Sequence, residues 1–292
     1  MFLYNFADKK AIEKGWSADK KYSVATANGT KYLLRISPID QYNRKQNEFR
    51  MMQRVDALGV PMCHPVEFGA CGVGVYSLQS WIDGKDAEEV IHTFSDNEQY
   101  RYGFDAGRIL KTIHSIPAPE FQEDWETRFN RKIDRNILKY KECSIQYGNG
   151  RAFIDYIDEN RHLLINRPQC FQHGDYHLGN MMIDNNKQLQ VIDFDRSDFG
   201  DPWEEFNRIV WCVQRSSLFA SGMVNGYFDD DVPVLFWQLL ALYISSNTLS
   251  SLPWAIPFGQ NEINTMLTQA KNVLRWYDNM QNFIPVWYTN PA

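Results

Sequence analysis

The chain has 292 residues, 44% of them hydrophobic, which is enough to bury a substantial core in one large domain or in two lobes. Its net charge of −6 comes without a basic stripe, which excludes nucleic acid as the main partner and better fits a cationic small molecule. The longest apolar run, 232–244, is shorter than the roughly 20 residues that span a bilayer, so we expect a buried helix and no membrane partner. The first ten residues lack the features of a secretory signal, and we expect a cytoplasmic protein.

The first eighty residues have the pattern of a small β-rich lobe interrupted by one helix. Two strand candidates flank Asn28-Gly29, a dipeptide that favours a hairpin turn, and a helix candidate ends at Gly59 before Pro61. The expected strands are 21–27, 31–37, 66–68 and 73–78, and the expected helix is 43–58. After Gly84 the spacing of apolar residues becomes helical.

The rest of the chain is predicted to be mainly helical, with one hairpin. The helix candidates are 97–114, 152–164, 232–250 and 260–280. The hairpin joins two short apolar strands, 181–183 and 189–194, through the polar turn 184–187. We therefore predict an α+β fold with two lobes, one at 1–80 and one at 85–292, joined at 81–84.

One stretch carries the chemistry: H-G-D-Y-H-L-G-N at 173–180, followed by V-I-D-F-D at 191–195. Asp175 starts a loop, Asn180 ends it, and the next strand delivers Asp193 to the same edge of the sheet. One carboxylate can then accept a hydroxyl proton while an amide oxygen and a second carboxylate hold Mg²⁺, a hard cation that takes oxygen ligands. The pattern predicts a phosphoryl-transfer centre.

These motifs resemble those of the aminoglycoside phosphotransferase and choline kinase family, relatives of the eukaryotic protein kinases. The resemblance implies a bilobal protein-kinase-like α+β fold, with a small β-rich N-terminal nucleotide-binding lobe at 1–80, a hinge at 81–84, and a larger, mainly helical C-terminal catalytic and acceptor-binding lobe at 85–292. It implies that Asp175 is the catalytic base or orients the hydroxyl, that Asn180 and Asp193 bind Mg²⁺, and that His173 organises the loop.

The resemblance extends to the beginning of the chain. The segment 15–20, G-W-S-A-D-K, is similar to the family's nucleotide-positioning loop, in which Ser17 and nearby backbone N–H groups would contact phosphates. Arg35, in Y-L-L-R-I, stands where the family carries a phosphate-binding lysine or arginine. Glu48 matches the acid that pairs with this cation.

Two further segments match the family. The join Q-S-W-I-D-G resembles the hinge whose backbone groups read the purine edge, which places Ser80 and Ile82 in the nucleotide site. Asp201 stands before a proline, where the family's aspartate braces the catalytic loop through backbone hydrogen bonds. Glu205 replaces the aspartate that is usual at its position.

Together these features predict an enzyme that moves the γ-phosphoryl group of ATP or GTP, with Mg²⁺, to a hydroxyl of a small molecule. An aminoglycoside is the leading acceptor, and a role in antibiotic resistance follows from it. A metabolite such as choline, homoserine or a sugar-like alcohol is the alternative acceptor.

Two other classes of function compete with this interpretation. His173, Asp175 and His177 form an H-x-D-x-H array, and such arrays bind metal in some hydrolases. No second ligand cluster in the sequence completes that site. A kinase-like binding protein without turnover is the other alternative, but every expected catalytic position is occupied, which favours the enzyme.

Overall fold

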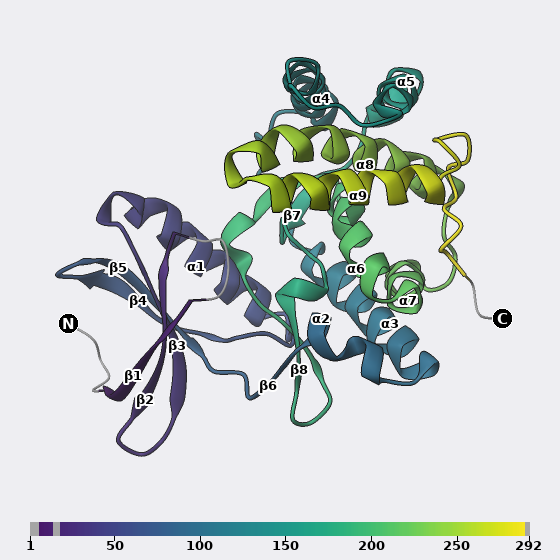
Figure 1. The fold of residues 1–292 in the computed structure, drawn as a ribbon. Coiled ribbons are helices and arrows are strands. Elements are labelled where there is room, and N and C mark those ends of the chain that lie inside the picture. Colours follow the sequence, from purple (N-terminus) through teal and green to yellow (C-terminus); the bar gives the residue numbers. More distant parts are fainter. Residues whose placement is uncertain (1–5, 14–17, 290–292) are drawn as a thin grey trace. The chain divides into compact units, whose positions relative to one another are not determined.

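The computed structural model describes residues 6–13 and 18–289, which form two compact units. The first unit contains residues 6–13, 18–89 and 180–197, and the second contains 90–179 and 198–289. The expected α+β class is confirmed, because the N-terminal part is rich in strands and the C-terminal part is mainly helical (Figure 1). The compact units differ from the lobe boundaries 1–80 and 85–292, since the hairpin around 181–191 joins the first unit.

The first unit is built on a five-stranded antiparallel sheet with the strand order β1-β2-β3-β5-β4 (Figure 1). Gly29 adopts φ 88° in the turn between β2 and β3, which confirms the hairpin expected at Asn28-Gly29. The strands are β1 (Phe6–Ile12), β2 (Lys20–Thr26), β3 (Lys31–Ser37), β4 (Pro65–Cys71) and β5 (Gly74–Ser80). Strand β1 was not predicted, because its central residues are polar and exposed and show no alternation.

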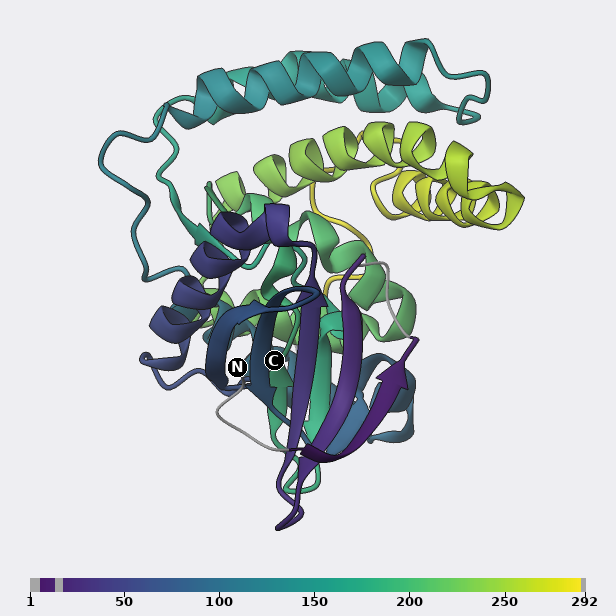
Figure 2. The same cartoon turned by 90° about the vertical axis from the view of Figure 1, so that its left-hand side faces the viewer.

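The sheet buries one cluster of apolar side chains and is covered by a helix. The buried cluster consists of Val24, Leu34, Tyr76 and Leu78. Helix α1 (Tyr42–Asp56) packs on β4 and β5, where the rings of Phe49 and Phe68 lie 5.5 Å apart (Figure 2). From α1, the side chain of Lys45 reaches Asp19, the residue before β2.

A three-stranded sheet completes the first unit, with the order β6-β8-β9. Its strands are β6 (Gly84–Asp86), β8 (Met181–Asp184) and β9 (Leu189–Val191), and the last two form the expected hairpin. Gly84 allows the close pairing of β6 with β8, since a Cβ atom there would lie 2.5 Å from the carbonyl oxygen of Ile183. Met181 pairs with Val191, so the residues before β8 and after β9 lie at the same end of the hairpin.

The second unit is mainly helical. Helix α8 is central in it, with α4, α5 and α9 packed against it (Figures 1 and 2). Its helices of eight residues or more are α3 (Asp96–Ile113), α4 (Trp125–Lys141), α5 (Gly150–Asn160), α7 (Ser217–Phe228), α8 (Val234–Ala255) and α9 (Gln260–Trp276). The shorter elements of this part of the chain include α6 (Ile209–Arg215) and the paired strands β7 (Cys170–Gln172) and β10 (Asp198–Gly200). The short helix α2 (Ala87–Val90) has its first three residues in the first unit.

The expected helices at 97–114, 152–164, 232–250 and 260–280 are confirmed as α3, α5, α8 and α9 with shifted ends. Helix α4 was missed, although Asp124 caps it by accepting from the N–H of Thr127, and its buried residues recur at helical spacing. None of the described helices is long and apolar enough to cross a membrane.

Helices α3 and α7 approach so closely that their backbones touch through glycines. A Cβ atom on Gly103 would lie 2.0 Å from the carbonyl oxygen of Phe219, and one on Gly107 would lie 2.2 Å from that of Met223. Gly222 and Gly226 make the reciprocal contacts from α7. Because each helix carries two glycines four residues apart, one face of each is a flat strip that admits the partner backbone.

Replacing Gly107 by alanine should lower the free energy of unfolding by about 2 kcal/mol or more, because the added methyl meets backbone atoms that cannot move aside. Thermal unfolding measures the change. Gly148→Ala is the matched control, since a Cβ atom there meets nothing within 4 Å. Equal stability of the two variants would contradict the tight contact.

Candidate active site

The loop that contains Asp175 follows β7 in the second unit and is ordered from within. Gly174 adopts φ 84°, a left-handed conformation that turns the chain sharply. His173 is fully buried, its Nδ1 accepts a hydrogen bond of 3.3 Å from the backbone N–H of Asp175, and its ring packs edge-on against Tyr176. His173 therefore holds the loop from inside, through its contacts with Asp175 and Tyr176.

Tyr176 ties the same loop to the glycine-packed helices. Its side chain is fully buried, and its hydroxyl donates to the carbonyl oxygen of Ala106 on α3 at 2.7 Å. Ala106 stands between Gly103 and Gly107, the residues that contact α7. The close helix pair therefore supports the residue directly after Asp175. The sequence offered no signal for this contact, because a buried tyrosine looks like any other core aromatic.

Glu205, not Asp201, braces the loop. The carboxylate of Glu205 accepts hydrogen bonds from the backbone N–H groups of Gly174, at 2.9 and 3.1 Å, and Tyr176, at 3.4 Å. His114 Nε2 lies 3.7 Å from the same carboxylate. The expectation that Asp201 makes the backbone bonds is corrected, because the carboxylate of Asp201 is engaged by Arg167 and Tyr243, whereas that of Glu205 faces the N–H groups of the loop.

Asp201 instead holds the segment behind the loop. Its buried carboxylate accepts from Arg167 at 2.6 and 3.0 Å, from the hydroxyl of Tyr243 at 2.5 Å and from the N–H of Trp203 at 2.9 Å. The guanidinium of Arg167 also stacks on the ring of Trp203, 3.9 Å from its centre. Asp201 is therefore structural, as expected, but its partners are Arg167, Tyr243 and the N–H of Trp203, none of which belongs to the loop that contains Asp175.

The brace at Glu205 should make the stability of the loop sensitive to acid. Burial alone would raise the pKa of Glu205, but the neighbouring imidazoles of His114 and His173 and the N–H of Gly174 lower it below the usual carboxyl value. A carboxylate with a lowered pKa stabilises the fold above its unfolded-state pKa and loses this contribution as the pH falls through the lowered pKa.

Glu205→Gln should therefore be less stable than the wild type at neutral pH, and the difference should shrink as the solution is acidified, because glutamine does not titrate. Thermal unfolding of both proteins over a series of pH values measures this difference. A difference that stays constant from neutral to strongly acidic pH would assign the loss to packing and not to charge.

The carboxylate of Asp175 faces two cationic or potentially cationic groups of the same unit. Its Oδ1 lies 3.2 Å from Arg208 Nε and 3.6 Å from His177 Nε2. Arg208 ends the 3-10 helix η6 (Glu204–Arg208), so one short element holds both the backbone of the loop, through Glu205, and its acidic side chain. Arg208 was missed because nothing in its local sequence marks it.

The H-x-D-x-H array does not form a metal site. Nδ1 of His173 accepts from the backbone N–H of Asp175. Over residues 6–13 and 18–289, no group of three or more His, Cys, Asp or Glu side chains is arranged to hold a metal ion. The geometry therefore does not support the alternative of a metal-dependent hydrolase.

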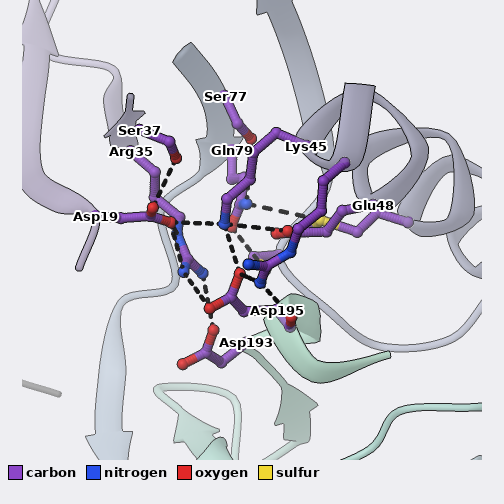
Figure 3. A network of polar contacts seen from close by, with 12 residues as sticks. Asp19, Arg35, Ser37, Lys45, Glu48, Ser77, Gln79, Asp193 and Asp195 are labelled. Atoms are coloured by element: carbon purple, nitrogen blue, oxygen red, sulfur yellow. Dashed lines mark hydrogen bonds and ion pairs between the residues drawn. The ribbon is translucent and has the colours of Figure 1, made fainter. Parts of the chain in front are cut away.

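In the first unit, Arg35 lies at the centre of a buried network of charges (Figure 3). Its Nε and Nη2 donate to one oxygen of Asp19 at 3.1 and 3.0 Å, and its Nη1 donates to Asp193 at 2.8 Å. Burial alone would lower the pKa of Arg35, but the charges of Asp193, Glu48 and Asp19 raise it, so the guanidinium stays protonated. Arg35 and Asp193, predicted separately, are in direct contact.

Glu48 pairs with a different cation from the one expected. Its carboxylate lies 3.1 Å from Nζ of Lys45, one turn earlier on α1, whereas Arg35 is bound by Asp19 (Figure 3). Lys45 Nζ also donates to Asp19 at 2.8 Å and to Asp195 at 2.5 Å. The expected pair of Arg35 and Glu48 is thus replaced by a network in which Glu48 acts on Arg35 only through its charge.

Asn180 and Asp193 lie at the same end of the β8-β9 hairpin. Asn180 directly precedes β8, and its carbonyl oxygen accepts from the N–H of Ile192, the residue before Asp193. Asp193 adopts a left-handed backbone conformation with φ 67°, which is uncommon for a residue other than glycine and frequent at functional sites. Its side chain is 31% exposed.

This pair of side chains fits Mg²⁺. An amide oxygen and a carboxylate oxygen are hard donors, and the partial exposure of Asp193 leaves room for water and phosphate ligands. The two residues stand at the same end of one hairpin, which restricts their separation. The donor set therefore suits a metal that keeps several ligands from solvent and substrate.

The two expected hinge residues differ in the hydrogen bonds that their backbone groups make within the described part of the chain. Ser80 ends β5, its N–H donates to the carbonyl oxygen of His64 at 2.9 Å, and its hydroxyl accepts from the N–H of His64 at 2.8 Å. Ile82 follows the strand, and in the described part of the chain no hydrogen bond engages its backbone. Ile82 therefore has both a donor and an acceptor to present to a ligand. Ser17 lies outside the described residues.

Sequence reasoning missed four charged residues of these networks: Asp19, Lys45, Asp195 and Arg208. Asp19 belongs to the recognised segment 15–20, and Asp195 ends the motif V-I-D-F-D. The signal that could have identified them is a charged residue next to a short strand. Lys45 is three residues before Glu48, a spacing that places both on one helix face. No local pattern identified Arg208.

Comparison with known proteins places these features in context. The family model of the phosphotransferase enzyme family matches residues 8–237. The chain is also similar to an aminoglycoside 3'-phosphotransferase of Niallia circulans, with 24% identity over 241 residues that cover 78% of this chain and 83% of that protein.

Three solved structures share the fold. The amicoumacin kinase hAmiN with AMP-PNP, Ca²⁺ and Ami matches with a TM-score of 0.68 at 12% identity, over 97% of this chain and 92% of that one. A thermostable mutant of APH(4)-Ia with ADP and hygromycin B matches at 0.65 and 16%, over 92% and 94%. The gentamicin complex of APH(2")-IIa matches at 0.64 and 17%, over 96% and 94%. These likenesses confirm the expected protein-kinase-like α+β fold.

Proposed function

The chain belongs to the phosphotransferase enzyme family, and on this premise we propose that it transfers the γ-phosphoryl group of ATP or GTP to a hydroxyl of a small molecule. The observation that carries this proposal is the contact of 2.8 Å between the guanidinium of Arg35 and the carboxylate of Asp193. The two residues are 158 positions apart in the sequence. The fold of one unit brings together the cation expected for the phosphates and the acid expected for the metal.

The nucleotide is bound mainly by residues of the first unit. The Nη1 group of Arg35, which donates to Asp193, is the donor that phosphate oxygens would engage. Ser17 would contact the phosphates, and Glu48 would add negative charge that keeps Arg35 protonated. Ile82 would present its backbone N–H and carbonyl to the purine edge, while Ser80 would contribute to the wall of that site because its own N–H is occupied.

The metal site of this proposal consists of Asn180 and Asp193. Their oxygens would hold Mg²⁺, and bound Mg²⁺ neutralises the negative charge of the phosphates. The structures of relatives that contain a nucleotide, one of them with Ca²⁺, support a nucleotide co-substrate held with a divalent cation.

Asp175 would orient the acceptor hydroxyl and take its proton. The groups around it are suited to positioning, since Glu205 holds the backbone on both sides of Asp175 and Arg208 holds its side chain. Phosphoryl transfer of this kind depends mostly on alignment and charge, and a loop that is ordered before substrate binds reduces the entropy lost on alignment.

The acceptor we propose is an aminoglycoside. The curated relative is an aminoglycoside 3'-phosphotransferase, and the solved structures include complexes with hygromycin B and gentamicin. The net charge of −6 suits a polycationic acceptor. Modification of an aminoglycoside inside the cell would confer resistance, and we place the protein in the cytoplasm, where nucleoside triphosphates are available.

The test is a panel of acceptors incubated with the purified protein, Mg²⁺ and either ATP or GTP. We expect acceptor-dependent release of nucleoside diphosphate with at least one aminoglycoside, and a phosphorylated product by mass spectrometry. Choline, homoserine and a simple sugar test the alternative of a metabolite kinase. Phosphorylation of one of these, with every aminoglycoside unmodified, would overturn the acceptor and keep the kinase. No consumption of nucleotide with any acceptor would contradict the enzyme.

A further inference from the structure

The acid that binds one edge of Arg35 is Asp19, whereas Glu48 was expected. The Nε and Nη2 groups along one edge of its guanidinium donate to Asp19, and only Nη1 donates to Asp193 (Figure 3). We propose that Asp19 is the positioning residue that fixes Arg35 for phosphate binding, in the place expected for Glu48. This inference rests on the proposed function, since it concerns the cation that would bind the phosphates.

The register of the sheet explains how Asp19 reaches Arg35. Lys20 pairs with Ile36, so the register continued by one residue sets Asp19, just before β2, opposite Ser37, whose hydroxyl donates to it. Residues opposite each other in an antiparallel pair share a face, and so do residues two apart on one strand. Asp19, Ser37 and Arg35 are therefore on the same face, which α1 covers with Lys45.

The carboxylate of Asp19 is fully engaged. One oxygen accepts from the hydroxyl of Ser37 at 2.6 Å, and the other accepts from Arg35 and from Lys45 Nζ at 2.8 Å. Its side chain is only 3% exposed. A buried carboxylate bonded on both oxygens has one orientation, and a guanidinium bonded to it along one edge has its remaining N–H groups aimed in one direction.

Glu48 is less suited to this role. One of its oxygens, Oε2, is buried without a hydrogen bond in the described part of the chain, although it lies 3.1 Å from Lys45 Nζ. Burial raises the pKa of Glu48 above the usual carboxyl value. Burial alone would also raise the pKa of Asp19, but the bonds from Lys45 and Ser37 and the charge of Arg35 lower it. Asp19 is thus the acid that is hydrogen-bonded to Arg35, whereas Glu48 acts on Arg35 only through its charge.

A purely structural role for Asp19 makes a different prediction from a positioning role. If Asp19 only stabilised the first unit, its loss would affect ligands with and without phosphates to the same extent. If Asp19 orients Arg35, its loss should weaken ligands with phosphates and spare the nucleoside. Comparing a triphosphate with adenosine therefore separates the two roles.

The experiment measures binding of Mg²⁺–AMP-PNP and of adenosine to the full chain by calorimetric titration. Asp19→Asn should weaken AMP-PNP about tenfold, the amount expected for one charge-assisted hydrogen bond, and change adenosine binding less than about twofold. Glu48→Gln should weaken AMP-PNP less than Asp19→Asn does. Asp8→Asn, an exposed site in the same unit, is the control for loss of a negative charge.

A second variant covers the case in which Asp19→Asn does not fold. Ser37→Ala removes the bond to one Asp19 oxygen and leaves Arg35 its partner, so AMP-PNP should weaken about threefold in the same direction. Unchanged AMP-PNP affinity in the folded variants, equal losses for adenosine, or a larger loss in Glu48→Gln would each overturn the inference. A wild type that binds neither ligand would overturn the proposed function first, and the inference with it.

Discussion

Asp175→Asn should lower kcat by about 10³-fold and leave KM for the nucleotide within about threefold. Asparagine keeps the shape of the side chain and an oxygen that Arg208 can contact, but it cannot take a proton from the hydroxyl. The residues proposed to hold the nucleotide, Arg35 and Asp193, belong to the first unit, whereas Asp175 belongs to the second. The substitution should therefore affect the chemical step and spare nucleotide binding.

Steady-state kinetics with a saturating acceptor measure this effect. Asp134→Asn is the matched control, because Asp134 is an exposed acid of the second unit whose ion pair with Arg161 lies on the surface, and its kcat should stay within about twofold. Turnover of Asp175→Asn within tenfold of the wild type would exclude Asp175 as the base. A parallel rise in KM would instead indicate that Asp175 helps to bind the nucleotide.

Asp193→Ala should abolish the part of nucleotide affinity that depends on Mg²⁺, a loss of at least about tenfold. The change removes one of two proposed oxygen ligands. It also removes a carboxylate that competes with phosphate for the guanidinium of Arg35. Binding of metal-free nucleotide should therefore stay the same or improve, because the partner that occupies Nη1 is gone.

Nucleotide is titrated into the wild type and the variant, once with Mg²⁺ and once with a chelator. The two titrations measure the Mg²⁺-dependent affinity and the affinity for metal-free nucleotide. Asp195→Asn offers a comparison from the same segment: its carboxylate is bonded by Lys45 and Arg44, and its loss should leave the effect of Mg²⁺ largely in place. An Asp193→Ala protein whose affinity still rises on addition of Mg²⁺ as in the wild type would rule out Asp193 as a metal ligand.

The elements found correctly from the sequence are those whose signal is local. The turn at Asn28-Gly29, the hairpin around 184–187 and the helix before Gly59 each depend on residues within a few positions of one another. Strand β1 was missed because its polar residues show no strand pattern. It is a strand because it pairs with β2, and that pairing cannot be seen in its own sequence. Helix α4 was missed although its cap and apolar spacing were present.

The residues of the candidate site also differ in whether their signal is local. Asp175, Asn180 and Asp193 were identified because the motif that contains them is contiguous apart from one hairpin. The partner of Arg35 was assigned to Glu48 and is Asp19, because strand register decides which acid shares a face with the cation. The brace of the loop was assigned to Asp201 and is Glu205, because tertiary packing decides which carboxylate faces the loop backbone and which one meets Arg167 and Tyr243.

By itself, the sequence determined the fold class and the family and singled out the candidate site residues, because these depend on residue types at short spacings. The tertiary structure alone decided the partners of those residues: Asp19 and Lys45 beside Arg35, and Glu205 and Arg208 beside Asp175. It also decided that four glycines bring α3 and α7 into backbone contact behind the loop. The physical reason is that charge pairing and packing depend on distances in space, which strand register and helix contact set between residues far apart in the chain.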